Sequence, residues 1–101
     1  MKSIFHLAEP DVWESAAASG FYAADSLAVE GFIHCSTAEQ VPGTFNRYYA
    51  GRIDLVLLEV DSAGLDVRWE AATGESFPHV YEAIPVDRTI DRGRYAGEQV
   101  G

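Results

Sequence analysis

One apolar run near the middle of the chain, residues 54–60, constrains the fold more than any other feature of the sequence. Five of its seven residues are apolar, and they do not alternate with polar ones. A run of this kind predicts a strand that is buried on both faces. Such a strand occupies a central position, so we expect a sheet built around this segment.

Shorter apolar or alternating segments predict the remaining strands. Residues 66–70 alternate, with Val67 and Trp69 opposite Arg68 and Glu70, as expected for a half-buried strand. The other predicted strands are residues 3–7, 31–35, 79–84 and 87–90. The segments without a clear pattern, expected to be loops or turns, are residues 21–29, 61–64 and 71–76.

A first helix is predicted after the first strand. Pro10 suits the first helical turn, where its missing N–H costs nothing, and Glu9 and Asp11 suit the positive end of the helix dipole. Gly20 is a plausible end for this helix.

A second helix is predicted beyond the strand at 31–35. Ser36 and Glu39 have the spacing of a capping box. An apolar face at helical spacing follows and ends before Gly51; it consists of Val41, Phe45, Tyr48 and Tyr49. Pro42 lies too far inside for a first-turn proline, so we expect it to kink or split this helix.

The order of these elements predicts an α+β fold. Two helices in the N-terminal half pack on a mixed, mostly antiparallel β-sheet. With 101 residues, the chain has room for one domain, residues 1–101.

Charge and cysteine content limit the function classes. Seven Lys and Arg against sixteen Asp and Glu give a net charge of −9, which argues against general binding to nucleic acids or anionic membranes. No apolar segment approaches the ~20 residues of a membrane span. The single cysteine, Cys35, cannot form a disulfide within the chain. We therefore expect a cytoplasmic protein.

The three histidines, His6, His34 and His79, are the first candidates for chemistry. Each lies in a predicted strand, on the face opposite its most apolar neighbours, because strand side chains alternate. If these faces converge, one cleft holds three imidazoles. The alternative is that each histidine is simply hydrogen-bonded within the fold.

The segment from His34 into the second helix predicts an anion site. Free N–H groups at a helix start, together with the hydroxyls of Ser36 and Thr37, can cradle a phosphate. A plain helix cap explains the same residues equally well. The side chain of Cys35 should point away from His34, into the core.

Further candidates surround these positions. Tyr22 and Tyr81 could stack on a planar ligand, and Arg47 and Arg68 could bind a phosphate or carboxylate. Glu30 and Glu70 could line the rim of the cleft. Three histidines could also hold zinc, but no local ligand pair supports this, and we expect no metal.

An ordered series of motifs resembles a bacterial family known as domain of unknown function 952, from about Ile4 to about Pro85. The most specific motifs are Glu-Gly-Phe-Ile-His-Cys-Ser at 30–36 and Phe-Pro-His-Val-Tyr at 77–81. A C-terminal strand and tail, about 86–101, lie outside the resemblance. The family is grouped by remote similarity with the ADP-ribosyltransferase-like fold, a split sheet that grips NAD.

The resemblance implies roles for the candidates. His6 would hold the adenosine ribose of NAD. His34 with Ser36 would contact the nicotinamide ribose or the pyrophosphate, and Tyr22 or Tyr81 would stack on the nicotinamide. His79 would orient the acceptor or stabilise the oxocarbenium-like charge. The sequence departs from the superfamily pattern because no glutamate is clearly placed as the catalytic acid.

These observations lead to two functional hypotheses. The first is an NAD-binding, ADP-ribosyltransferase-like enzyme with a histidine-rich cleft, whose acceptor the sequence does not name. The second is a module that binds a nucleotide or small anion in the same cleft without catalysis.

Overall fold

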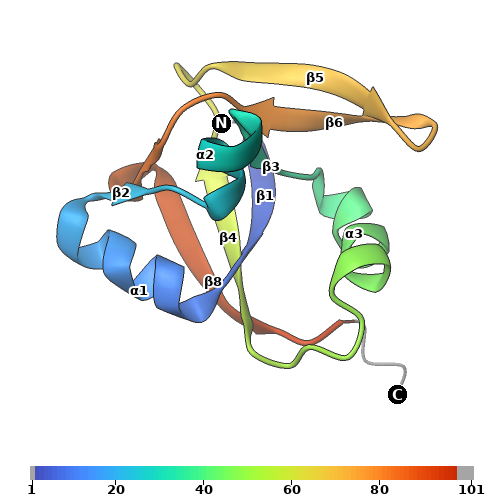
Figure 1. Cartoon of the computed structure of the whole chain (residues 1–101), viewed down its shortest axis with the longest axis horizontal. Helices are drawn as coiled ribbons and strands as arrows, with labels where there is room; N and C mark the ends of the chain where they lie inside the picture. The colour runs from blue at the N-terminus through green and yellow to red at the C-terminus, as the bar shows by residue number, and fades with distance from the viewer. Residues whose placement is uncertain (1, 98–101) are drawn as a thin grey trace.

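A computed structural model describes residues 2–97. Its first sheet has the order β1-β4-β8, so the strongly apolar strand is the central one, as predicted. Both neighbours pair with it antiparallel (Figure 1). Leu55, Leu58 and Val60 are fully buried. The strands of this sheet are β1 (Ser3–Ala8), β4 (Leu55–Asp61) and β8 (Thr89–Tyr95).

A second sheet has the order β3-β6-β5. It consists of β3 (Ile33–His34), β6 (Glu75–Val80) and β5 (Val67–Ala72). A single antiparallel bridge between Phe5 and Ser36 joins β1 to the segment after β3, so the two sheets meet there. A third pair, β2 (Phe21–Tyr22) with β7 (Ile84–Pro85), is also antiparallel.

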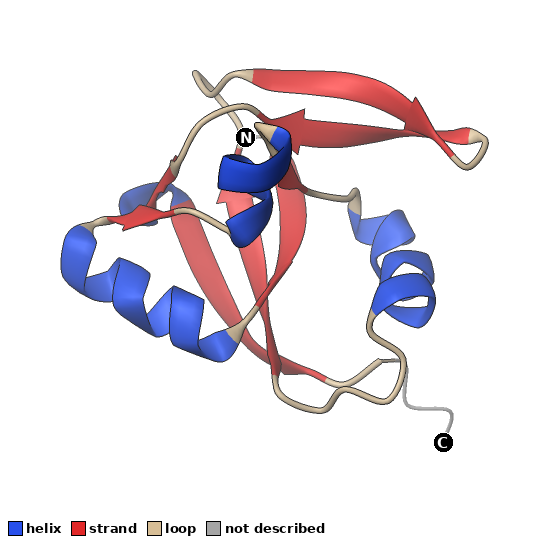
Figure 2. Cartoon of the chain, in the orientation of Figure 1, coloured by secondary structure: helices blue, strands red, loops and turns tan. Residues whose placement is uncertain are grey.

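The α+β prediction is confirmed, with one refinement of the sheet. All strand pairs in the described part of the chain are antiparallel, so the mixed character that we expected is not found there. The sheet is split into separate pieces, with helices around them (Figure 2).

The first helix, α1 (Pro10–Ser19), matches its prediction at both ends. Pro10 lies in its first turn, and Gly20 ends it with a φ of 87°, a left-handed conformation that favours glycine. No helix of the described residues is long and apolar enough to span a membrane.

The second predicted helix is split, as the position of Pro42 required. A 3₁₀ turn, η1 (Ala38–Gln40), precedes the helix α3 (Val41–Tyr48), and Pro42 lies in the first turn of α3. The predicted capping box is one residue out of place. Thr37 and Gln40 form the reciprocal hydrogen bonds, and Ser36 and Glu39 do not.

Two loop predictions were wrong. Residues 21–29 contain strand β2 and a short helix, α2 (Asp25–Glu30), which is too brief for a periodic pattern to reveal. The expected loop at 71–76 is only a tight turn, because β5 continues to Ala72 and β6 begins at Glu75.

The predicted strand at 79–84 also needs correction. β6 ends at Val80, and only Ile84–Pro85 pairs again, as β7. The residues that we assigned to a strand at 87–90 divide between a 3₁₀ turn, η2 (Val86–Arg88), and the start of β8. The 3₁₀ turn that follows Pro85 separates β7 from β8.

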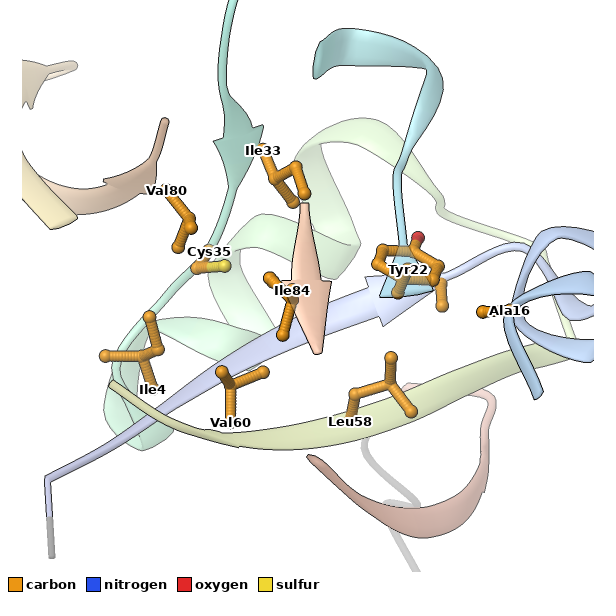
Figure 3. Close-up of a cluster of buried hydrophobic side chains, with 10 residues drawn as sticks. Ile4, Ala16, Tyr22, Ile33, Cys35, Leu58, Val60, Val80 and Ile84 are labelled. Atoms are coloured by element: carbon orange, nitrogen blue, oxygen red, sulfur yellow. The ribbon is translucent and has the colours of Figure 1, made fainter. Parts of the chain in front are cut away.

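The main core lies where these pieces face one another (Figure 3). It includes buried side chains from α1, β1, β4, β6 and the two-residue strands β2, β3 and β7; among them are Ile4, Leu58, Ile33, Val80 and Ile84. Cys35 is also buried here, as predicted. A second cluster packs α3 against the other face of β1 and β4, around Phe45 and Leu55.

Candidate functional site

A cavity of about 670 Å³ is lined by residues of β1, β2, β3, β6 and α3. Six of the nine predicted site residues line it: His6, Tyr22, His34, Ser36, Arg47 and His79. The other three, Thr37, Arg68 and Tyr81, are not among its lining residues. Its volume falls within the range of small-molecule sites.

His34 and His79 form the centre of this site. They are directly opposite each other in the antiparallel pair β3–β6, on the same face of the sheet. Their ring centroids are 5.2 Å apart, and the rings meet edge to face at 74°. Phe32 stacks on His79, with centroids 4.2 Å apart and an angle of 14°, which fixes the plane of that imidazole.

His79 is paired with a carboxylate from the neighbouring strand. Its Nδ1 lies 2.7 Å from Oε1 of Glu70, and the hydroxyl of Tyr81 donates to the same oxygen at 2.6 Å. These bonds, first that of Tyr81 and then that of His79, lower the pKa of Glu70. With Nδ1 donating to a carboxylate, neutral His79 carries its free lone pair on Nε2, which makes no hydrogen bond with the described residues.

His34 is paired in a similar way. Its Nε2 lies 2.9 Å from Oε2 of Glu30, the last residue of α2, and both side chains are about half exposed. Gly31 ends α2 with a φ of 89° and turns the chain into β3. This turn places the carboxylate of Glu30 next to the imidazole of His34. The site therefore holds two imidazoles, each with its own carboxylate.

His6 lies behind this pair and is buried. Its Nδ1 is 2.6 Å from the backbone carbonyl of His34, and its Nε2 is 2.7 Å from the hydroxyl of Tyr22. A carbonyl can only accept, so Nδ1 donates and Nε2 accepts the Tyr22 proton. Burial lowers the pKa of His6 to about 4, so the ring is neutral at pH 7.

This geometry corrects the roles that we expected for His6 and Tyr22. Both ring nitrogens of His6 are engaged within the protein, so neither can hold a ribose. Tyr22 is 1% exposed, and burial raises the pKa of its hydroxyl, so its ring is not free to stack on a ligand. Their observed contacts position the backbone of His34.

The groups that we expected to bind an anion at Ser36 and Thr37 are largely hydrogen-bonded within the protein. The hydroxyl of Thr37 accepts from the N–H of Gln40, and the amide oxygen of Gln40 accepts from the N–H of Thr37. Ser36 lines the cavity, and its Oγ lies 3.0 Å from Oγ1 of Thr44. The helix-cap alternative therefore accounts for Thr37.

The two candidate arginines differ. Arg47 lines the cavity and donates from Nη1 to Oγ1 of Thr73, but it forms no ion pair among the described residues. Arg68 lies outside, paired with Asp66 and placed 4.2 Å over the ring of Tyr81. Tyr81 is thus covered by Arg68 and bonded to Glu70, which leaves little of it for a planar ligand.

The cavity is rich in acid. Five of its lining residues are acidic, against a single arginine: Glu9, Asp25, Glu30, Glu39 and Glu75. This electrostatic surrounding favours a ligand that carries or develops positive charge near the histidines.

No metal centre is assembled in residues 2–97. No group of three or more His, Cys, Asp or Glu side chains there is arranged to hold a metal ion. Both ring nitrogens of His6 are hydrogen-bonded within the protein, and burial raises the pKa of the Cys35 thiol to about 12.

Sequence reasoning named Glu30 and Glu70 only as rim candidates and missed their pairing with the histidines. The first pairing had a signal, since Glu30 precedes His34 by four residues. The second depends on the register of β5 and β6. That register places Arg68 opposite His79, and Glu70 follows two residues later on the same face of β5. The sequence contains no trace of that register.

The chain was compared with families, curated proteins and solved structures. The sequence model of a family described as protein of unknown function (DUF952) matches residues 7–91, which extends past the end of our expected range. No curated protein matches.

Solved structures of protein CC0527 from Caulobacter crescentus are similar to the chain. Its crystal structure is 32% identical with a TM-score of 0.79, and covers 89% of this chain and 85% of its own. Its solution structure is 33% identical with a TM-score of 0.74, and covers 89% of this chain and 81% of its own. Since the family match spans most of the sequence, the chain belongs to the DUF952 family of proteins of unknown function.

Proposed function

We propose that this protein is an enzyme that binds NAD in the cavity and transfers its ADP-ribosyl group to an acceptor. One observation carries the proposal. Two imidazoles with centroids 5.2 Å apart, His34 and His79, each bonded to a carboxylate, line a cavity of small-molecule size. A histidine held by a carboxylate is a suitable general base near neutral pH.

The reaction can be followed atom by atom. The bond between the nicotinamide nitrogen and C1′ of the ribose breaks, and its electron pair leaves with neutral nicotinamide. Positive charge develops on the ribose. The nucleophilic atom of the acceptor then bonds to C1′ and loses its proton to Nε2 of His79, while Glu70 holds the resulting imidazolium.

The charges around the cavity support this assignment. Under this proposal, Glu30 and the other lining carboxylates would stabilise the positive charge of the pyridinium ring and of the developing oxocarbenium ion. Arg47, which forms no ion pair in residues 2–97, is the cation available to the pyrophosphate. Glu30 would thus serve in place of the catalytic glutamate that the sequence lacks at its expected position.

The fold resemblance is part of the proposal. The split, antiparallel arrangement, with β1 bridged to the segment after β3, supports a likeness to the ADP-ribosyltransferase-like fold. Under this proposal the protein acts in the cytoplasm, which its one unpaired cysteine supports.

The test is incubation of the full chain with NAD at about millimolar concentration, with chromatography for released nicotinamide. We expect turnover that His79→Gln lowers by about 10²–10⁴-fold. Arg47→Ala should weaken NAD binding, whereas the matched variant Arg94→Ala, on the distant strand β8, should not. If NAD neither perturbs the imidazole NMR signals of His34 and His79 nor loses nicotinamide, the proposal is rejected.

A second candidate is nucleotide or small-anion binding without catalysis. The observation that favours it is Arg47, a guanidinium without a carboxylate partner on the cavity wall. Saturable nucleotide binding, with no nicotinamide release and no effect of His79→Gln on affinity, would select this candidate.

A further inference from the structure

Strand β5 is an open edge of the second sheet. Within residues 2–97 it pairs only with β6, so its outer side carries backbone N–H and C=O groups without strand partners there (Figure 1). It is six residues long, VRWEAA, without proline, lysine or an irregularity of register. Open edges of this kind pair readily with another strand.

One edge of the first sheet, β8, is built differently. Its pairing with β4 shifts register between Val56 and Leu58, and Gly93 within it has a φ of 90°. Irregularities of this kind bend a strand and protect it from further pairing. β5 has neither a register shift nor a glycine with positive φ. Its third residue, Trp69, is 56% exposed.

The side chains of β5 are complementary to themselves in one antiparallel register. With Trp69 opposite Trp69 of a second copy, Arg68 faces Glu70 of that copy, and Val67 faces Ala71. Centring the pair on Arg68 or on Glu70 would instead place two like charges directly opposite each other, which is destabilising. Charge thus favours the register centred on Trp69 over these two.

The atoms needed for this contact are free. Arg68 uses Nε and Nη2 on Asp66, and its Nη1 makes no hydrogen bond among residues 2–97. Glu70 uses only Oε1, on His79 and Tyr81, so its Oε2 is also unused within that range. Both side chains are well exposed, at 58% and 40%.

We infer that β5 is a dimerisation edge, and that two copies of this chain pair antiparallel about Trp69 with Arg68 of each copy bound to Glu70 of the other. The two sheets then continue into one six-stranded sheet. Each copy also contributes a guanidinium to the carboxylate that holds His79 of its partner, so the dimer contact touches both candidate sites.

The expected dimer is weak, because pairing of one strand buries less than a standard interface. We expect a dissociation constant on the order of tens of micromolar. Sedimentation equilibrium of the full chain over a wide concentration range measures it directly, and hydrogen exchange should show protection of β5 amides that grows with protein concentration.

Charge-swap variants give the decisive comparison. Arg68→Glu and Glu70→Arg each place like charges in both cross-strand pairs, so each alone should dimerise at least about tenfold more weakly. Mixed together, the two variants restore opposite charges in both pairs and should form a heterodimer. Arg94→Glu makes the same change of net charge on β8 and should leave dimerisation as in the wild type.

The inference is overturned if the wild-type chain stays monomeric to about millimolar concentration, or if Arg68→Glu dimerises as the wild type does. It is also overturned if the two folded charge-swap variants fail to associate with each other. If Glu70→Arg does not fold, the dimer dissociation constants of Arg68→Glu and Arg94→Glu still test the inference. The first should be raised and the second unchanged. None of these results depends on the proposed activity towards NAD.

Discussion

At the residue scale, the site consists of two histidine–carboxylate pairs with a buried histidine behind them. His79 and His34 keep one nitrogen each on a carboxylate, and His6 is held between Tyr22 and the backbone of His34. The same residue type thus has two kinds of hydrogen-bonding partner, a carboxylate in the cavity pair and neutral groups around His6. The cavity pair is available for proton transfer, and His6 is fixed as a neutral hydrogen-bonding group.

The role of Glu70 can be tested separately from that of His79. We expect Glu70→Gln to lower kcat for nicotinamide release at least about tenfold, because the amide leaves the imidazolium of His79 without its counter-charge. The KM for NAD should change little, since Glu70 does not line the cavity. A change in KM alone would contradict the positioning role, and Glu70→Asp should recover part of the activity.

His6 makes stability depend on pH. In the unfolded chain an imidazole binds its proton near pH 6.5, whereas burial lowers the pKa in the fold to about 4. The unfolded state therefore binds more protons in this interval, and stability falls as pH decreases from about 6.5 towards 4. The loss amounts to roughly 3 kcal/mol at its full extent.

Urea unfolding between pH 7.5 and 5 measures the first part of this loss, since its full extent is reached only below about pH 4. Carboxylates with lowered pKa, such as Glu59 and Glu70, lose their stabilisation only below their ordinary value of 4.5. The interval above pH 5 therefore isolates the imidazoles. In His6→Asn, the free energy of unfolding should fall less steeply as the pH decreases. The same pH dependence in this variant as in the wild type would contradict this explanation.

At the scale of elements, short pieces carry the site. Helix α2 has six residues and strand β3 has two, yet they supply Glu30 and His34. Neither is long enough to be stable alone. Their positions depend on the caps and on the pairing with β6 around them.

The cap of the η1–α3 segment gives a prediction at this scale. Thr37→Ala should lower the free energy of unfolding by about 1 kcal/mol, because it removes an acceptor from the N–H of Gln40. Glu39→Ala should change it by less than about 0.5 kcal/mol, since Glu39 takes no part in the observed capping box. Thermal or urea unfolding of both variants distinguishes the observed cap from the one that sequence spacing indicated.

At the scale of the whole molecule, net charge is the dominant property. A chain with a charge of −9 over 101 residues repels itself in the folded state. The five acidic residues around the cavity concentrate part of this charge at the candidate site. Stability should therefore respond to ionic strength.

We expect the unfolding midpoint to rise as NaCl increases from about 20 to 200 mM, because the Debye length shortens over this range. The comparison should be made at pH 7, where the carboxylates are ionised. A falling midpoint would show that attractive pairs, such as Arg52 with Glu9 and Arg92 with Glu59, outweigh the repulsion.

The amino-acid sequence by itself determined the properties that depend on local pattern. The apolar run at 54–60 predicted the central strand, Pro10 and Gly20 predicted the limits of α1, and alternation placed Cys35 in the core and His34 on the opposite face. These features follow from the period of a strand or helix and from backbone preferences of single residues, which neighbours in sequence are sufficient to set.

Only the tertiary structure decided which residues meet. The register of β3, β6 and β5 brings His34, His79 and Glu70 together, and the approach of β2 and β3 to β1 occupies both nitrogens of His6. Strand order and register depend on contacts between segments far apart in the chain, for which one sequence contains no periodic signal. For that physical reason the candidate histidines could be named in advance, whereas their separate roles required the fold.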